Sequence, residues 1–340
     1  MQLVCLTVPL GLCLLFLWMA RKSSTMVPTA VVGTKKKSIA TLTREGINTL
    51  EDLKLALQYA IQLEFSTIPP YLTAEWSIKD QKQAARTIIH EIVIQEMVHM
   101  GLACNMLSAI GGKANLTQTN FVPNYPCTGL PGGVHSDLRV SLLPLSAEAL
   151  KTFMEIEMPQ HGPIAAASDV NIGDFYDAIA DGFSRLNPTF SGGFQLEHSF
   201  PVGELFRINN VEDALKAIRT IKDQGEGSQQ TPMPEDSPSG EPSHYYAFKQ
   251  LLVGKRLRKA DDGSWHFDGE DMPLPAVHTF TSGSELETAD FNGTLKALLK
   301  ALEDVWSNGA SFHQAMQAMM RLRKQGIGLM ERGILPNFLP

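Results

Sequence analysis

The chain has 340 residues, of which 44% are hydrophobic and 19% are charged, so its composition is that of a globular protein and not of a disordered one. Its net charge of -7 and the lack of a long Lys/Arg stripe argue against nucleic-acid binding, because phosphate recognition requires a basic surface. Two of the four cysteines, Cys5 and Cys13, lie in an N-terminal apolar run, which excludes a disulfide scaffold.

The chain begins with an apolar segment, Leu3 to Ala20, whose length fits either a single membrane span or the core of a signal peptide. Arg21 and Lys22 follow this segment and no basic residue precedes it, which predicts an uncleaved anchor with the body on the cytoplasmic side. The absence of an A-x-A cleavage site also favours an anchor. The alternative is secretion after cleavage, and two Asn-x-Thr sequons would then be glycosylation sites.

We therefore divide the chain into four parts. Residues 1–22 are the signal or anchor segment, and residues 23–45, rich in Ser, Thr and Lys, are a polar linker. Residues 46–255 are predicted to form a helical domain. Residues 256–340 are predicted to be a C-terminal extension with helices packed on that domain.

Two long helical patterns open the domain. The first begins at Thr49, and Pro69-Pro70 predicts its end because proline interrupts helical hydrogen bonding. The second keeps one apolar stripe from Ile88 to Ile110, and Gly111-Gly112 predicts its end. Together they predict a helical hairpin.

A long crossover follows this hairpin. Residues 113–145 are rich in Pro, Gly and Asn, lack a sustained period, and contain one short strand pattern at Leu138 to Leu143. Further helical patterns cover 146–158, 174–186, 211–224, 243–253 and 295–329, with an inserted loop at 225–242. The expected fold is mainly α: a ferritin-like four-helix bundle with a long crossover, additional C-terminal helices and an N-terminal anchor.

Three acidic residues continue apolar stripes on separate helical patterns. They are Glu64, Glu96 and Glu157, and no Lys or Arg falls on the same stripes. An ionised carboxylate in an apolar interior is costly unless it is paired or bound to a metal. Three such acids therefore predict a shared cationic partner.

Glu-x-x-His spacing sharpens this prediction, because residues three apart on a helix project from one face and can bind the same metal ion. Glu96 and His99 have this spacing, and Glu241 and His244 repeat it. A ferritin-like di-metal site needs two such pairs and one further Glu from each of two helices, which Glu64 and Glu157 supply.

The last acidic ligand is ambiguous. Pro242 confines Glu241 to a non-helical or first-turn position, which weakens its pairing with His244. Glu226 competes with Glu241 for this place if residues 225–242 are a loop inserted into one helix. Both remain candidates on spacing alone.

Other notable side chains have simpler interpretations. His90 lies off the apolar stripe and is expected on a solvated face. Met316, Met319 and Met320 are expected to fill core space. Tyr71 and Trp76 are candidates for lining a substrate pocket, although core packing would explain them equally well.

Five segments also resemble a known family. Residues 63–72 read Leu-Glu-Phe-Ser-Thr-Ile-Pro-Pro-Tyr-Leu, and Glu96-Met-Val-His99 and Glu157-Met-Pro follow, with Gln-Gly-Glu-Gly-Ser and Ser-His-Tyr-Tyr-Ala-Phe at 224–228 and 243–248. This set, over roughly residues 50–255, resembles the ferritin-like domain of the iminophenyl-pyruvate dimer synthase family. Members of that family act in oxidative coupling of imines derived from aromatic amino acids, including in the violacein pathway.

The resemblance implies a ligand set. It points to metal ligation by Glu64, Glu96, His99, Glu157, Glu226 and His244, and so favours Glu226 over Glu241. The chain departs from the family in being short, in having no further domain beyond its helical tail, and in its N-terminal anchor. Inheritance of the fold is therefore a firmer expectation than inheritance of the substrate.

These observations predict a non-haem oxidoreductase of secondary metabolism that oxidises or couples a small organic, amino-acid-derived substrate. Carboxylate ligands with two imidazoles favour two iron ions, or manganese, over zinc or copper(I). No Gly-rich nucleotide fingerprint is present, so electrons would come from a partner protein or pathway enzyme. The alternative is a non-catalytic metal-binding or scaffold protein of the same fold.

Overall fold

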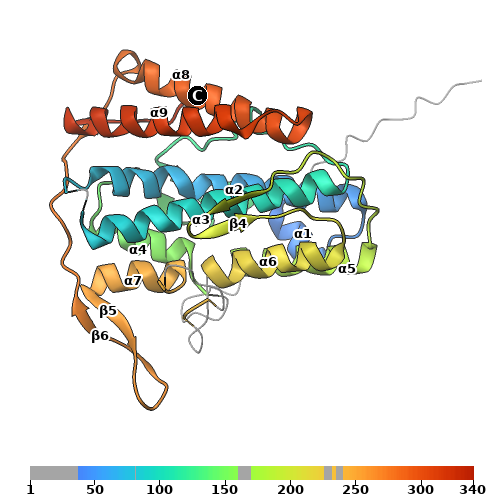
Figure 1. The fold of residues 1–340 in the computed structure, drawn as a ribbon, viewed down its shortest axis with the longest axis horizontal. Helices are drawn as coiled ribbons and strands as arrows, with labels where there is room; N and C mark the ends of the chain where they lie inside the picture. Colours follow the sequence, from blue (N-terminus) through green and yellow to red (C-terminus); the bar gives the residue numbers. More distant parts are fainter. Residues whose placement is uncertain (1–36, 81, 160–169, 226–231, 235–239) are drawn as a thin grey trace, which may run out of the picture. The chain divides into compact units, whose positions relative to one another are not determined.

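The computed structural model describes residues 37–340 apart from 81, 160–169, 226–231 and 235–239, and it is mainly helical (Figure 1). The helices are α1 (Ile39–Glu45), α2 (Leu50–Ser77), α3 (Ala84–Ala109), the 3-10 turn η1 (Pro131–Gly133), α4 (Ala147–Ile156), α5 (Ile172–Leu186), α6 (Val211–Gly225), α7 (His244–Val253), α8 (Glu285–Asn308) and α9 (Phe312–Glu331). The strands pair two by two: β1 (Cys127–Thr128) with β2 (Arg139–Val140), β3 (His198–Phe200) with β4 (Gly203–Leu205), β5 (Lys255–Lys259) with β6 (Trp265–Asp271), and β7 (Thr281–Ser282) with β8 (Ile334–Leu335).

The predicted hairpin of α2 and α3 forms one half of the bundle (Figure 1). Thr49 begins α2, where its side chain accepts the Asp52 amide. Gly111 ends α3 with a φ of 74°, a left-handed conformation that glycine adopts without steric cost. The amide of Gly112 then bonds to the Leu107 carbonyl at 2.9 Å, which closes the last turn.

The predicted end of the first helix at Pro69-Pro70 is wrong, because α2 continues through both prolines to Ser77. Pro70 has no amide hydrogen for the Ser66 carbonyl, its normal partner four residues earlier. That carbonyl instead accepts the Tyr125 hydroxyl at 2.6 Å. A side chain from the crossover therefore replaces the missing helical hydrogen bond.

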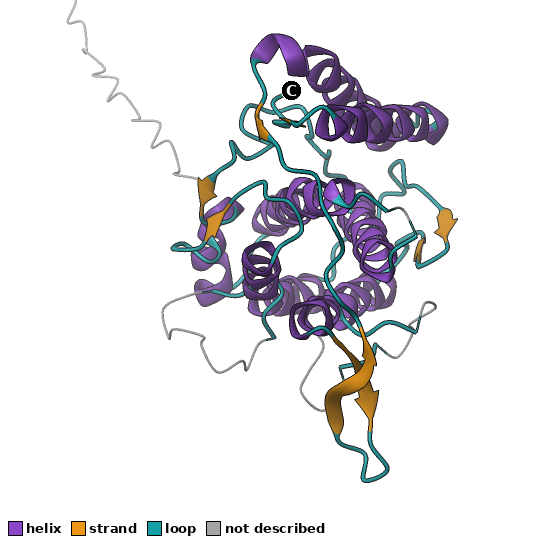
Figure 2. Ribbon diagram, turned by 90° about the vertical axis from the view of Figure 1, so that its left-hand side faces the viewer, coloured by secondary structure: helices purple, strands orange, loops and turns teal. Residues whose placement is uncertain are grey.

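The other half of the bundle consists of two helix pairs, because α4 packs on α7 and α5 packs on α6. Figure 2 shows the helices of the bundle arranged in a ring, seen nearly end-on. The chain leaves helical structure after α4 and again after α6, and it re-enters at α5 and α7. The side chains Glu157 and His244 stand at two of these interruptions, at the end of α4 and the start of α7.

The folded body starts earlier than predicted. Ile39–Glu45, within the stretch expected to be linker, forms α1, and its side chains Ile39 and Leu42 are fully buried. The predicted anchor at 1–22 lies outside the described residues. Among the residues that are described, α3 alone is long and apolar enough to span a membrane, and 89% of its most apolar window is buried inside the body.

The C-terminal extension contains a β-hairpin as well as the predicted helices. Strands β5 and β6 are joined through Asp262-Gly263, a dipeptide typical of hairpin turns, and Gly263 has a φ of 86°. Helix α8 starts ten residues earlier than expected, at a capping box in which Ser284 and Glu287 exchange hydrogen bonds. Helices α8 and α9 pair and lie on α3 and α2 (Figure 1).

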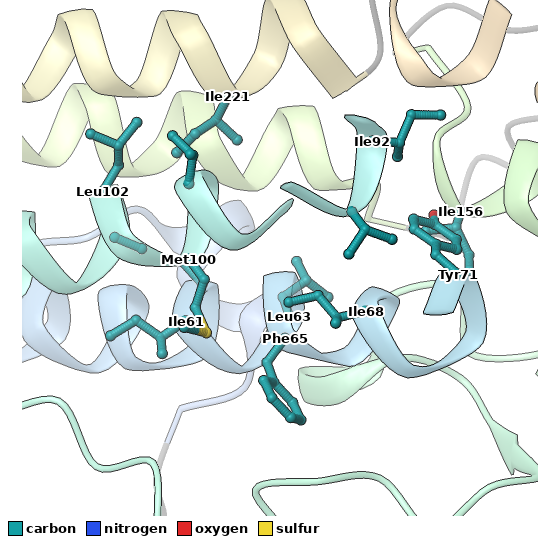
Figure 3. Close-up of a cluster of buried hydrophobic side chains, with 14 of the residues drawn as sticks. Ile61, Leu63, Phe65, Ile68, Tyr71, Ile92, Met100, Leu102, Ile156 and Ile221 are labelled. Atoms are coloured by element: carbon teal, nitrogen blue, oxygen red, sulfur yellow. The ribbon is translucent and has the colours of Figure 1, made fainter. Parts of the chain in front are cut away.

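The core joins α2 and α3 to the opposite half of the bundle. Figure 3 shows buried side chains such as Leu63, Ile92, Ile156 and Ile221 facing one another from α2, α3, α4 and α6. The polar side chains of the site lie within this apolar interior.

Candidate metal centre

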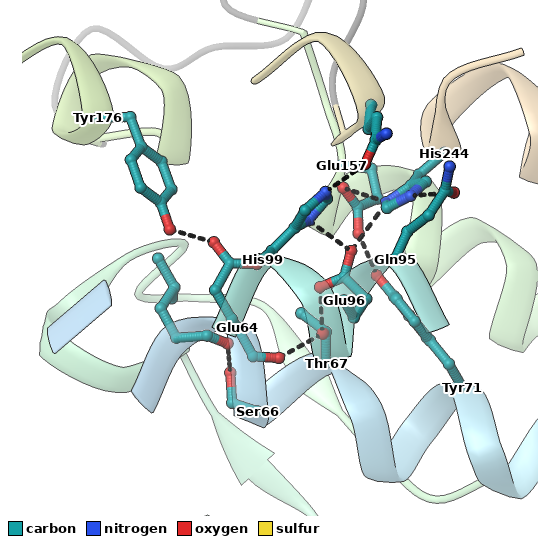
Figure 4. A network of polar contacts seen from close by, with 12 residues as sticks. Glu64, Ser66, Thr67, Tyr71, Gln95, Glu96, His99, Glu157, Tyr176 and His244 are labelled. Carbon is teal, nitrogen blue, oxygen red and sulfur yellow. Dashed lines mark hydrogen bonds and ion pairs between the residues drawn. The ribbon is translucent and has the colours of Figure 1, made fainter. Parts of the chain in front are cut away.

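The first cluster of the site gathers Glu64, Glu96 and His99 from α2 and α3 (Figure 4). His99 Nδ1 lies 3.6 Å from Glu64 Oε2 and 3.7 Å from Glu96 Oε1. Each of the three side chains is at most 5% exposed. Because one ligand atom from each lies within 4.8 Å of the others, the three can converge on a single ion.

The second cluster shares Glu96 and adds Glu157 and His244. His244 Nδ1 lies 2.8 Å from Glu96 Oε1 and 3.6 Å from Glu157 Oε2. This buried nitrogen forms no hydrogen bond of good geometry with any described atom. A buried nitrogen in this position can be satisfied by binding a metal cation. Glu96 therefore stands between two Glu/His groups and belongs to both.

Two glutamines orient the histidines, and the sequence analysis did not identify them. Gln224 Oε1 lies 2.8 Å from His99 Nε2, and Gln95 Oε1 lies 3.0 Å from His244 Nε2. An amide oxygen can only accept, so each Nε2 carries the hydrogen and each Nδ1 faces the carboxylates. The signal that could have identified Gln95 is its burial next to Glu96, because a buried amide side chain rarely lacks a hydrogen-bond partner.

We expect Gln224→Leu to weaken metal binding about 10- to 100-fold while the protein stays folded, because outer partners fix the ring orientation of a ligating histidine. Competition with a chelator, followed by elemental analysis, measures this affinity. The half-buried Gln58, whose side chain bonds to the Asn115 backbone, is replaced in the same way as the control and should leave the affinity unchanged. Equal affinity in Gln224→Leu and the parent would contradict the assigned role of Gln224.

Three hydroxyl groups hold the carboxylates in place. Tyr176 donates to Glu64, and Tyr71 donates to Glu157 Oε1 at 2.6 Å. The Thr67 hydroxyl lies 2.7 Å from Glu96 Oε2. Burial and then the charge of Glu157 raise the pKa of Tyr71 well above its usual value, so this phenol remains a donor at neutral pH.

Electrostatics inside the site couple the acids to the imidazoles. Burial lowers the pKa of His99, but Glu64 and Glu96 outweigh it and raise the pKa to about 10. Likewise, Glu157 and Glu96 overcome burial and raise the pKa of His244 to about 9. Burial raises the pKa of Glu96, yet the two histidines hold it well below its usual range. Without a metal, both imidazoles are therefore cationic at neutral pH and partly compensate the buried acids.

The two candidates for the last acidic ligand have different outcomes. Glu241 lies outside both clusters, where Arg256 and Gln250 donate to its carboxylate at 2.7 and 2.8 Å. Glu226 lies outside the described residues. Its neighbour Gly225 comes so close to Glu157 that an added Cβ would lie 3.4 Å from Glu157 Oε2.

The two aromatic candidates for a substrate pocket lie on different sides of α2. Tyr71 is fully buried beside Glu157 and packs on Phe153 and Phe248. Trp76 instead lines an apolar cavity between the bundle and the C-terminal helices. The prediction that His90 lies on a solvated face is wrong in part, since His90 lines the same cavity with its side chain 39% exposed.

A small space adjoins the clusters, with a volume of about 20 Å³. Its lining includes four side chains of the two clusters and four neighbours: Glu64, Glu96, His99 and Glu157, with Ile172, Tyr176, Ile221 and Lys222. A water molecule needs about 10–15 Å³ measured in this way, so the space among the described residues holds one molecule of the size of water. Lys222 is itself paired with Asp177 at 2.5 Å.

A helical bundle that gathers acids and histidines around one buried centre has the layout of the di-metal carboxylate class of four-helix proteins. The sequence model of the ferritin-like family matches residues 57–253, more than half of the chain, and the chain belongs to this family. A ferritin-like protein from Caulobacter vibrioides, known from a crystal structure, shares the fold: the TM-score is 0.67 at 24% identity, covering 86% of this chain and 99% of that chain. No curated protein matches the sequence.

Proposed function

We propose that this protein is a di-metal oxidoreductase that would hold two ions, iron or manganese, with Glu96 shared between their two sites. The observation that carries this proposal is the sharing of Glu96 between two Glu/His clusters, each with an imidazole Nδ1 facing it. Oxygen-rich ligand sets with two imidazoles favour iron and manganese over softer metals. When bound, a pair of iron ions in such a site supplies a redox centre that reacts with dioxygen.

Charge balance supports Glu226 as the sixth ligand. Glu64, Glu96 and Glu157 contribute three negative charges, and among the described residues no Lys or Arg forms an ion pair with them, since Lys222 beside them is paired with Asp177. A fourth carboxylate would match the charge of two divalent cations. The closeness of Gly225 to Glu157 supports Glu226 in this role, whereas Glu241 is already paired with Arg256.

The surrounding residues serve this chemistry by holding the ligands and excluding water. Tyr71, Tyr176 and Thr67 fix the three carboxylates, and Gln95 and Gln224 fix the imidazoles. Because these partners are buried, the ligand atoms need little reorganisation when a metal binds. The small adjoining space leaves room for a small oxidant beside the clusters.

The resemblance to the imine-coupling family supports a small, amino-acid-derived substrate. Its oxidation would remove two electrons and two protons, which dioxygen accepts to form hydrogen peroxide. Full reduction of dioxygen to two water molecules would need two further electrons from a partner protein and two further protons from solvent. We also propose that residues 1–22 anchor the protein to a membrane, on the basis of their composition and flanking charges.

The test of this function uses the full chain loaded anaerobically with two ferrous ions and then mixed with dioxygen. Imines generated from aromatic amino acids by an amino-acid oxidase serve as substrates, and mass spectrometry detects oxidised or coupled products. We expect iron oxidation and product formation in the parent and neither above background in Glu96→Gln. Iron that binds but oxidises no faster than in solution would favour the second candidate, a non-catalytic metal-binding protein.

Metal binding should release protons and tighten as the pH rises. The raised pKa values of His99 and His244, about 10 and about 9, mean that both imidazoles are protonated near neutral pH before a metal arrives. Each must lose its proton to ligate, so protons compete with the metal at lower pH. Titration with Mn²⁺ in weakly buffered solution should show up to two protons released per chain. Affinity that is constant between pH 6 and 9 would contradict this account.

A further inference from the structure

A second cavity lies between the bundle and the C-terminal helices α8 and α9, which cross above α2 and α3 in Figure 1. Its volume is about 250 Å³, and its walls are almost entirely apolar. The side chains lining it come from α2, α3, α8 and α9 and include Leu72, Met97, Leu298, Met316 and Met319. Methionine walls adapt to ligands of different shapes because the side chain is unbranched and flexible.

This cavity is separate from the candidate metal centre. Residues Glu64 and Thr67 of α2 face the metal centre, whereas Ile68 and Leu72 face the cavity. On α3, Glu96 faces the centre and Met97 the cavity. No residue lines both spaces among those that the structure describes, so the two helices form a wall between them.

Several side chains of the cavity wall carry a buried polar atom without a hydrogen-bond partner among the described residues, including Trp76, Glu75 and His90. The indole Nε1 of Trp76 is a donor without an acceptor, and its side chain is 2% exposed. Glu75 Oε2 is an acceptor without a donor on a fully buried side chain, although Arg86 and His90 approach the other oxygen at 2.8 and 3.2 Å. Arg86 Nε and His90 Nδ1, on the two residues that approach Glu75, also lack a hydrogen-bond partner among the described residues. Buried polar atoms in native proteins are nearly always satisfied, so a guest in the cavity can complete this polar group at Trp76 Nε1 and Glu75 Oε2.

We propose that this cavity binds a single-headed apolar molecule, such as a medium-chain alcohol, whose neutral hydroxyl accepts from Trp76 and donates to Glu75. A hydroxyl is both donor and acceptor, which matches the unsatisfied Trp76 Nε1 and Glu75 Oε2. An engineered apolar cavity of roughly 150 Å³ holds the six carbons of benzene, so about 250 Å³ corresponds to about ten carbons. Met320 is part of the cavity wall and is 63% exposed, so the cavity reaches the surface at this residue and a ligand can enter there.

The test is photolabelling of the full chain with a ten-carbon alcohol that carries a diazirine, followed by mapping of the labelled residues by mass spectrometry. We expect label on cavity residues such as Met97, Met100 and Met316, and competition by unlabelled 1-decanol. Decane should compete about fivefold less well, since it lacks the hydroxyl. Trp76→Phe keeps an aromatic ring and removes the N–H, so the alcohol should lose about this much affinity relative to decane.

Two variants on α9 provide a matched comparison. Met316→Trp fills part of the cavity and should abolish labelling, whereas Gln314→Trp adds the same side chain at an exposed position and should not. Label spread over the surface, or undiminished label in a Met316→Trp protein that melts like the parent, would overturn the proposal. If Met316→Trp does not fold, an equal preference for decanol over decane in Trp76→Phe and parent would overturn the assigned head-group contact. None of these readouts depends on the metal centre.

Discussion

The Glu96→Gln variant is expected to lose both metal ions, whereas Glu64→Gln loses one. Glu96 belongs to both clusters, and its Oε1 lies 2.8 Å from His244 Nδ1 and 3.7 Å from His99 Nδ1. Glu64 belongs to the first cluster alone. Elemental analysis after loading and gel filtration should therefore give about two, zero and one ions per chain for parent, Glu96→Gln and Glu64→Gln.

Glu241→Gln is the matched control for this series. It removes a carboxylate close in sequence to His244 that is paired with Arg256 outside both clusters, so the metal content should stay at two. Circular dichroism should show that all three variants keep the parental helix content. A loss of metal in Glu241→Gln, or one ion retained in Glu96→Gln, would contradict the bridging assignment.

Gly326→Ala should destabilise the protein by about 1–2 kcal/mol. A methyl group at this position would overlap the six-membered ring of Trp76, which stacks on Phe338 and meets the edge of Phe291. Overpacking a buried contact typically lowers the free energy of unfolding by about 1–3 kcal/mol. The better helix propensity of alanine offsets up to about 1 kcal/mol of this loss. The expected result is a lower urea midpoint.

Gly328→Ala is the control on the same helix. Outside the adjoining residues and backbone of α9 itself, no atom of the described residues lies within 4 Å of the added methyl group, so only the helix propensity changes. This variant should gain about 0.5–1 kcal/mol. If the two variants had the same urea midpoint, the close packing of α9 on Trp76 would be contradicted.

The acidic residues of the candidate site were predictable because burial and charge conflict at them. Glu64, Glu96 and Glu157 continue apolar stripes, and the structure buries all three within reach of His99 and His244. Helical periodicity is a local property, so the sequence specifies which residues share an interior face. The sequence does not specify which residues of other segments contact each of these side chains.

Features that depend on distant segments escaped prediction. Pro69-Pro70 does not end α2, because Tyr125 from the crossover satisfies the freed Ser66 carbonyl. Gln224 and His99 are 125 positions apart in the sequence, and no local sequence pattern predicts their contact. The cavity beside Trp76 exists only because α9 packs against α2. Each of these features is created by tertiary packing, which overrides local preference.

The measurement that tests the central claim most directly is anomalous X-ray diffraction at the iron edge from crystals of the iron-loaded protein. We predict two anomalous peaks on either side of Glu96, one beside Glu64 and His99 and the other beside Glu157 and His244. A single peak, or peaks away from Glu96, would contradict a di-metal centre bridged by this residue.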